Sequence, residues 1–102
     1  MTPVPPARLT RSITIRCSAR ERQIVETARA LDGFTALSAW ARSCSLLVHP
    51  RVCVVVDRRM DARYRVRLSV ADLHTIDRRR GARDRSTWIR DCCLTRAARI
   101  ER

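Results

Sequence analysis

The nine residues SAWARSCSL (38–46) recur 48 positions later as STWIRDCCL (86–94). Serine, tryptophan, arginine, cysteine and leucine keep the same offsets in both stretches, and the two tryptophans are the only ones in the chain. A glycine stands five residues before each of these serines, at Gly33 and Gly81. Because an internal repeat constrains the architecture more strongly than local propensity does, we expect two similar units.

The length of 102 residues allows one small domain or two very small units that share a core. A single copy of roughly 45 residues buries too little apolar surface to fold by itself, so the two copies are expected to complete each other. The apolar share of 45% is sufficient for a core and argues against a disordered chain.

The charge is strongly basic. The chain has 22 basic residues against 10 acidic ones, a net charge of +12, and every basic residue is arginine. Two explanations of the bias towards arginine are equally compatible with the composition: the codon usage of a GC-rich genome and a functional requirement for guanidinium groups. A net charge of this size on a small domain nevertheless makes nucleic acid the leading candidate partner, because the guanidinium fork matches phosphate oxygens and guanine edges.

The cysteines do not form a familiar metal motif. They are odd in number and contain no CxxC pair, and they lie at positions 17, 44, 53, 92 and 93. Buried free thiols in a reducing cytoplasm are the simplest interpretation. A zinc site made of Cys44, His49, Cys92 and Cys93 is the alternative, but its spacing matches no common ligand pattern.

No constellation of catalytic residues is apparent, so we expect neither an enzyme nor a bound cofactor. The N-terminus has no apolar segment typical of a signal peptide, and no apolar run has membrane-spanning length. These patterns predict a cytoplasmic protein without a membrane partner.

The first unit is predicted over residues 12–48, after a flexible proline-rich arm at 1–11. Alternation of polar and apolar residues over 12–17 predicts a strand. Ser18 and Glu21 form a capping-box pattern, and a helix is expected to follow as far as about Asp32. Its apolar stripe consists of Ile24, Val25, Ala28 and Leu31.

A second helix is expected after Gly33, with Thr35 as its N-cap and an end before Pro50. The apolar side of this helix is predicted to hold Leu37, Trp40, Ala41, Cys44 and either Leu47 or Val48. A connector over 49–62 follows, in which the β-branched run Val52–Val56 favours an additional strand.

The second unit is predicted over residues 63–102. Tyr64, Val66 and Leu68 alternate with arginines in a strand, and Ser69 with Asp72 repeats the capping box. The helix that follows is three residues shorter than its counterpart. We expect Asp84 to cap a last helix whose tail frays over 97–102. The expected core residues of the two helices are Leu73, Ile76, Trp88, Ile89, Cys92 and Cys93.

Each unit contains one strand, and a lone strand leaves both edges unpaired. The natural partner is the strand of the other unit, laid antiparallel. The predicted fold is therefore mostly helical with a short antiparallel β-ribbon, in which two fused units place four helices around one core that contains both tryptophans.

At this level of detail the chain resembles the ribbon-helix-helix family of DNA-binding proteins, which includes the Arc, MetJ and CopG repressors. The strand–serine junctions (residues 16–18 and 67–69), the two glycines and the Ser-x-Trp-x-Arg blocks carry the resemblance. Most members are homodimers, whereas this chain resembles a single-chain pseudo-dimer and is similar to the tandem protein TraY of conjugative plasmids. The shorter helix of the second unit departs from the family pattern.

The resemblance implies that the ribbon enters the major groove of double-stranded DNA and reads base edges. The matching outward positions are Ser12, Thr14, Arg16, Arg63, Arg65 and Arg67. Ordinary solvent-facing strand residues are the alternative, which four arginines on one face make less attractive. Because the two reading strands differ, we expect an asymmetric target whose half under the second unit is richer in guanine.

The family also binds phosphates at the N-terminus of its second helix. The matching positions are Thr35, Ala36, Arg83, Asp84 and Arg85. The carboxylate of Asp84 conflicts with this role, because it repels a phosphate. The arginine run at 78–80 is either a further phosphate contact or a solvated helix end. Stacking of the tryptophans on single-stranded bases is disfavoured by their position on apolar helix faces.

The resemblance implies a transcriptional repressor of plasmid or phage type. The alternative is an accessory protein at a plasmid transfer origin that assembles with a relaxase. Further copies of the chain side by side on DNA are also compatible with the pattern. An antitoxin-like interaction module ranks lower, because Val52–Val56 is its sole candidate docking surface.

Overall fold

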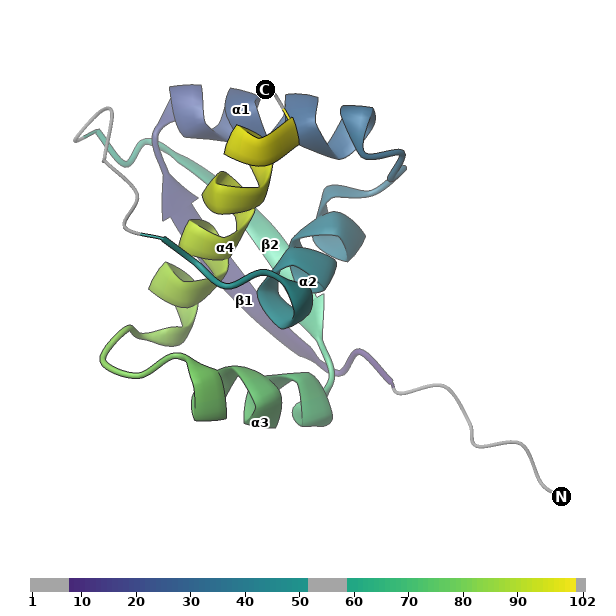
Figure 1. Cartoon of the computed structure of the whole chain (residues 1–102), viewed down its shortest axis with the longest axis vertical. Coiled ribbons are helices and arrows are strands. Elements are labelled where there is room, and N and C mark those ends of the chain that lie inside the picture. Colours follow the sequence, from purple (N-terminus) through teal and green to yellow (C-terminus); the bar gives the residue numbers. More distant parts are fainter. Residues whose placement is uncertain (1–7, 52–58, 101–102) are drawn as a thin grey trace, which may run out of the picture.

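The computed structural model describes residues 8–51 and 59–100. Within these ranges a strand and two helices are followed by a second strand and two further helices (Figure 1). The elements are β1 (Arg11–Cys17), α1 (Ala19–Leu31), α2 (Leu37–Leu47), β2 (Ala62–Leu68), α3 (Val70–Arg79) and α4 (Arg85–Ile100). The predicted mostly helical fold with one short ribbon is confirmed.

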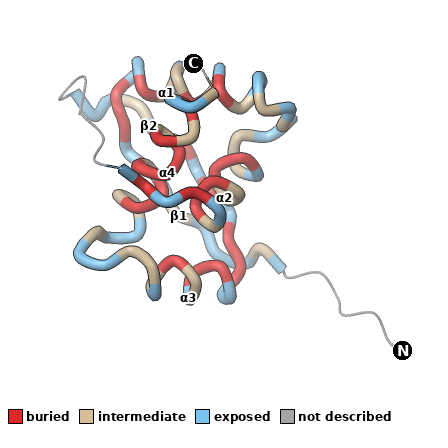
Figure 2. The backbone as a smooth tube through the Cα atoms, in the orientation of Figure 1, coloured by how far each residue is buried: buried red, intermediate tan, exposed pale blue. Residues whose placement is uncertain are grey.

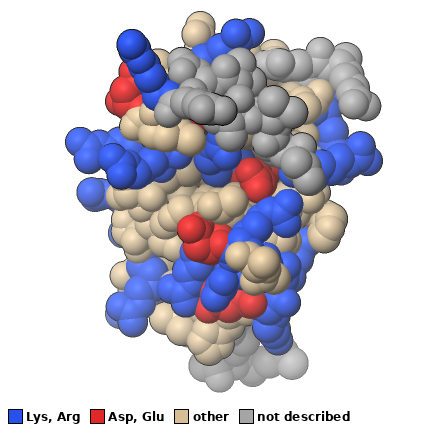
Figure 3. Space-filling view, turned by 90° about the vertical axis from the view of Figure 1, so that its left-hand side faces the viewer, with Lys and Arg blue, Asp and Glu red and all other residues tan. Residues whose placement is uncertain are grey.

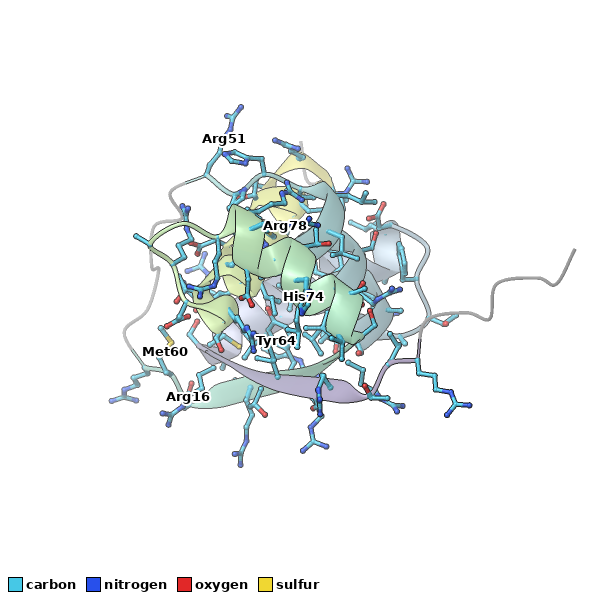
Figure 4. All side chains as sticks on the ribbon, turned by 90° about the horizontal axis from the view of Figure 1, so that it is seen from below. Arg16, Arg51, Met60, Tyr64, His74 and Arg78 are labelled. Carbon is cyan, nitrogen blue, oxygen red and sulfur yellow. The ribbon has the colours of Figure 1, made fainter. Side chains whose placement is uncertain are left out.

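The two strands pair with each other in antiparallel register. Thr14 lies opposite Arg65 at the centre of the ribbon, and the flanking pairs are Ser12 with Arg67 and Arg16 with Arg63. Each strand begins one residue earlier than predicted, so Arg11 belongs to the ribbon and not to the N-terminal arm. Seen along the sheet, all four helices cover one face of the ribbon and leave the other face open (Figure 4).

The core lies between the inner face of the ribbon and the helices (Figure 2). Ile15, Val66 and Leu68 contribute from the strands and are completely buried. Trp40 on α2 and Trp88 on α4 are 0% and 1% exposed. This confirms the prediction that the tryptophans pack in the core, and both indole N–H groups are satisfied, by the Asp32 carboxylate and by the Ser45 carbonyl oxygen.

The predicted turn and capping chemistry is largely confirmed. Both serines accept a hydrogen bond from the N–H of the acid three residues on, and both acids accept one from the serine N–H. Gly33 and Gly81 have φ of +80° and +58°, the left-handed region that favours glycine after a helix. The Asp84 carboxylate accepts a hydrogen bond of 2.7 Å from the Thr87 N–H, as expected of an N-cap.

Three local predictions are wrong. Ala36 and not Thr35 is the N-cap of α2, and the cap has no side-chain hydrogen bond, because the chain is still extended at Ala36. Leu31 is 64% exposed, since α1 ends there and Phe34 beyond the turn packs against the core instead. The tail does not fray at Ala97, which is completely buried within α4.

The choice left open between Leu47 and Val48 is decided by the end of α2. Val48 is 7% exposed and joins the core, whereas Leu47 is 80% exposed. The run Val52–Val56, predicted as an additional strand, lies outside the described residues.

Two ion pairs, each with a buried carboxylate, connect the halves of the chain reciprocally. Arg42 on α2 donates to both carboxylate oxygens of Asp72 on α3, at 2.6 and 3.1 Å. Arg90 on α4 donates to the carboxylate of Glu21 on α1. Both acids are the capping-box acids described above, and both arginines are the arginine of the repeated nine-residue stretch. Each repeat therefore holds the first helix of the other half.

The charge of Asp72 is stabilised by this arrangement. Burial disfavours its carboxylate, but hydrogen bonds from Arg42 and from Ser69 outweigh that cost, so the pKa of Asp72 lies below its ordinary value. A group whose pKa is lower in the folded state than in the unfolded state stabilises the fold at pH values above the unfolded pKa. That contribution is lost as the pH falls through the folded pKa.

We predict that Arg90→Met lowers the free energy of unfolding by about 3–5 kcal/mol, because it leaves the Glu21 carboxylate buried without a counter-charge. Glu21→Gln preserves the capping box, since glutamine also suits that position, and removes the charge. In the Glu21→Gln background Arg90→Met should therefore cost much less. Urea denaturation of the four proteins measures the difference, and an equal cost in both backgrounds would contradict the ion-pair interpretation.

We also predict that Asp72→Asn destabilises the fold at pH 7 and that this penalty shrinks as the pH falls below about 4, where the Asp72 carboxylate of the unfolded wild-type chain begins to take up a proton. Urea denaturation between pH 7 and pH 2 measures it. A penalty that stays constant over this range would show that the carboxylate charge makes no contribution.

Candidate nucleic-acid interface

The open face of the ribbon presents every side chain that was predicted to read bases. All six are exposed, and Arg16 projects beyond the ribbon on the side away from the helices (Figure 4). Neither strand contains an acidic residue. The six side chains, which the sequence places far apart, thus share one surface: Ser12, Thr14, Arg16, Arg63, Arg65 and Arg67. We call this surface the arginine face.

The register that creates the arginine face is fixed by the opposite side of the sheet. Tyr64, Val66 and Leu68 alternate with its arginines and are all buried. A shift by one residue would move these apolar side chains into solvent and the arginines into the core. The core therefore decides which side chains are available for binding.

The guanidinium groups of this face are largely without protein partners. Those of Arg16, Arg63 and Arg65 make no hydrogen bond or ion pair within residues 8–51 and 59–100, whereas Arg67 approaches the Leu9 carbonyl oxygen at 3.5 Å. Of the sixteen other arginines in the described ranges, eight form ion pairs with carboxylates. Those in ion pairs with carboxylates are Arg22, Arg29, Arg42, Arg80, Arg83, Arg85, Arg90 and Arg96.

The acidic residues show the complementary pattern. Every carboxylate in the described ranges is engaged, and none of them contacts a side chain of the arginine face. Six form ion pairs, and Asp61 and Asp84 accept hydrogen bonds from backbone N–H groups. On one side of the molecule the acids lie between arginines, which project at its margins (Figure 3). The described acids thus neutralise arginines of the helices and of the turns beside them, and leave those of the arginine face without a counter-charge among the described residues.

The N-termini of the second helices flank the arginine face. The Arg67 N–H donates a 2.8 Å hydrogen bond to the Ser38 hydroxyl, which fixes the start of α2 beside β2. Thr35 and Ala36 are exposed there, at a helix end without a side-chain cap. The sequence does not predict this positioning role of Ser38, although Ser38 is the first residue of the repeated stretch.

The corresponding end of α4 borders β1. Ser86 and Thr87 line a groove there together with Thr14 and Arg16. The Asp84 carboxylate lines the same groove, and its pKa is lowered mainly by the hydrogen bond from the Thr87 N–H. This helix end is therefore occupied by a negative charge of the protein itself, in contrast to the start of α2.

The arginines around α4 are already committed to carboxylates. Arg83 pairs with Asp91 at 2.9 Å, and Arg85 pairs with Asp77 at 2.7 Å. Arg80 also contacts Asp77, and these two arginines hold the pKa of that carboxyl well below its usual range.

The rest of the run at 78–80 is divided between core and solvent. Arg79 donates to the Leu46 carbonyl oxygen and lies 5.3 Å from the centre of the Trp88 ring. Arg78 is exposed, with no hydrogen bond or ion pair to another described residue.

The four cysteines in the described ranges are buried free thiols. Burial raises the pKa of Cys92 to about 12, and its sulfur donates to the Val48 carbonyl oxygen at 3.3 Å. Among the described residues no three histidine, cysteine, aspartate or glutamate side chains come together as metal ligands would, so Cys44, His49, Cys92 and Cys93 do not form a zinc site. Cys53 lies outside these residues.

No helix within the described part of the chain is both long and apolar enough to cross a membrane. Comparisons with protein-family models, with curated protein sequences and with solved structures found no match to this chain.

Proposed function

We propose that this protein binds double-stranded DNA sequence-specifically by inserting its β-ribbon into the major groove. The arginine face carries this proposal, because it combines four arginines with no acid, and three of the guanidinium groups have no partner among the described residues. Several arginines that share one face without any carboxylate on it indicate a polyanionic partner.

The shape of the ribbon favours duplex DNA among polyanions. The major groove admits a two-stranded β-ribbon, and each base pair presents a distinct pattern of donors and acceptors there. An arginine on the ribbon can donate two hydrogen bonds to O6 and N7 of guanine, and the hydroxyls of Ser12 and Thr14 can bind several bases. The helices on the other face support the ribbon without obstructing its approach.

We further infer that the chain is a tandem ribbon-helix-helix pseudo-dimer. The capping serines Ser18 and Ser69 are 51 positions apart, and so are Thr14 and Arg65, which face each other at the centre of the ribbon. A two-fold axis through that central pair would exchange the two flanking pairs. The reciprocal ion pairs Arg42–Asp72 and Arg90–Glu21 would exchange in the same way, which supports the inference.

Each second helix would then contact a phosphate next to the ribbon. The exposed start of α2 at Thr35 and Ala36 offers uncapped backbone N–H groups for this contact. At α4 the Asp84 carboxylate repels a phosphate. The nearby Arg83 and Arg85 attract one less strongly than free arginines would, because they already form ion pairs with Asp91 and Asp77. The start of α2 is therefore the stronger candidate.

We infer a role as a transcriptional repressor, which acts by occupying its DNA site. The same interface would serve an accessory protein at a plasmid transfer origin. Sequencing the DNA fragments that co-purify with the protein distinguishes them: promoter fragments support repression, and fragments confined to a transfer origin support the accessory role. The antitoxin-like alternative depended on Val52–Val56, which lies outside the described residues.

We predict that Arg67→Ala weakens binding to the preferred duplex by about 1–3 kcal/mol and relaxes the base preference at one position, since a guanine contact would be lost. Arg99→Ala is the matched control, because it removes an equally exposed guanidinium from the end of α4. Fluorescence anisotropy at several salt concentrations measures both. Equal losses of affinity for the two variants would show that Arg67 contributes only non-specific charge and would contradict base reading by the arginine face.

We predict that Asp84→Asn strengthens binding by about two- to fivefold, similarly for preferred and random duplexes, because it removes a negative charge at a helix N-terminus near the DNA backbone. Asparagine is as good an N-cap as aspartate, so α4 should remain stable. If Asp84→Asn binds both duplexes with the wild-type affinity at low salt, the start of α4 does not lie near the phosphates and the prediction is wrong.

A further inference from the structure

The two ends of the arginine face differ in charge, which follows from the antiparallel register. Each end combines one side chain from each strand: Arg16 with Arg63 at one end, and Ser12 with Arg67 at the other. Each half of a DNA site therefore faces one end of the ribbon, which contains side chains of both strands, and does not face a single strand. An expectation that assigns one half-site to each unit, as drawn from the sequence, overlooks this mixing.

The Arg16–Arg63 end holds two like charges directly opposite each other. Such a pair destabilises a ribbon, since opposed side chains have Cβ atoms about 4.5–5.5 Å apart. Neither guanidinium has a carboxylate partner among the described residues. The acid nearest in sequence, Asp61, instead accepts a hydrogen bond from the Ala19 N–H at 3.3 Å.

Two protein acceptors near this end are already engaged. Arg22 occupies the carbonyl oxygen of Arg63, which it approaches at 2.6 Å, and pairs with Glu26. A ligand that offers acceptor atoms to both guanidinium groups would relieve the charge repulsion between Arg16 and Arg63. Two closely spaced guanidinium groups require two sets of acceptors, and the O6 and N7 atoms of two guanines provide them.

On the arginine face the opposite end has one guanidinium group fewer, and that group is more restrained. Ser12 contributes a hydroxyl in place of a guanidinium, and Arg67 is the only arginine of that pair. Its guanidinium already approaches the Leu9 carbonyl oxygen. This end can therefore engage at most one guanine through the bidentate contact, and its serine hydroxyl tolerates several bases.

We propose that the arginine face binds its duplex in a single orientation, with the Arg16–Arg63 end over two guanines and the Ser12–Arg67 end over a less constrained sequence. This inference rests on the proposed DNA-binding function and specifies its target. It differs from the expectation that each strand reads one half of the site, because Arg16 and Arg63 belong to different strands and act on the same end of the site.

The test is selection from a random duplex library with the full chain, followed by the same selection with Arg16→Ala, Arg63→Ala and Arg67→Ala. Arg16→Ala and Arg63→Ala should each lower the preference for guanine by about 5- to 150-fold at the same end of the selected motif. Arg67→Ala should act at the other end. Arg99→Ala, which removes an exposed charge outside the ribbon, should leave the motif unchanged.

The possible results separate this inference from the function on which it rests. A palindromic wild-type motif, or effects of Arg16→Ala and Arg63→Ala at opposite ends, would overturn the single orientation while leaving duplex binding intact. Selection without any enriched motif, or the absence of duplex binding at low salt, would overturn the proposed function together with the inference.

Discussion

Two seven-residue strands satisfy the backbone hydrogen-bonding groups of their facing edges by pairing with each other, and the rest of the fold depends on this constraint. The pairing joins segments separated by about half the chain and gives the ribbon two chemically opposite faces. Apolar side chains such as Val66 must face the helices, so the intervening arginines must face outwards. Burial of the core thus imposes an exposed positive surface on the other side.

The arginines of this chain perform two separable tasks. Arg42 and Arg90 hold the capping acids of the opposite halves and fix the helices around the core. Arg16, Arg63 and Arg65 have no comparable partner within 8–51 and 59–100 and belong to the outer face of the ribbon. Because the described carboxylates are used at helix ends and between helices, none of them neutralises an arginine on the outer face of the ribbon. We therefore regard the acidic residues as determinants of where the protein can bind a polyanion.

Much of the fold could be predicted from the sequence, because alternation, capping boxes and the repeat are local signals. The strands, the caps at Ser18 and Ser69 and the buried tryptophans follow from such signals. The reciprocal ion pairs could not be predicted, since contacts between Arg90 and Glu21 span 69 positions; the recurrence of the arginine was the one available hint. The prediction of Thr35 as the N-cap of α2 is wrong because capping propensity identifies a suitable residue type but does not determine at which residue the backbone becomes helical.

Dimethyl sulfate footprinting on a selected duplex tests the central claim most directly, because the reagent methylates guanine N7 in the major groove and adenine N3 in the minor groove. If the ribbon occupies the major groove, the protein should protect guanine N7 within the site and leave adenine N3 reactive. Protection confined to adenine N3, or no protection of a duplex that the protein demonstrably binds, would contradict a ribbon in the major groove.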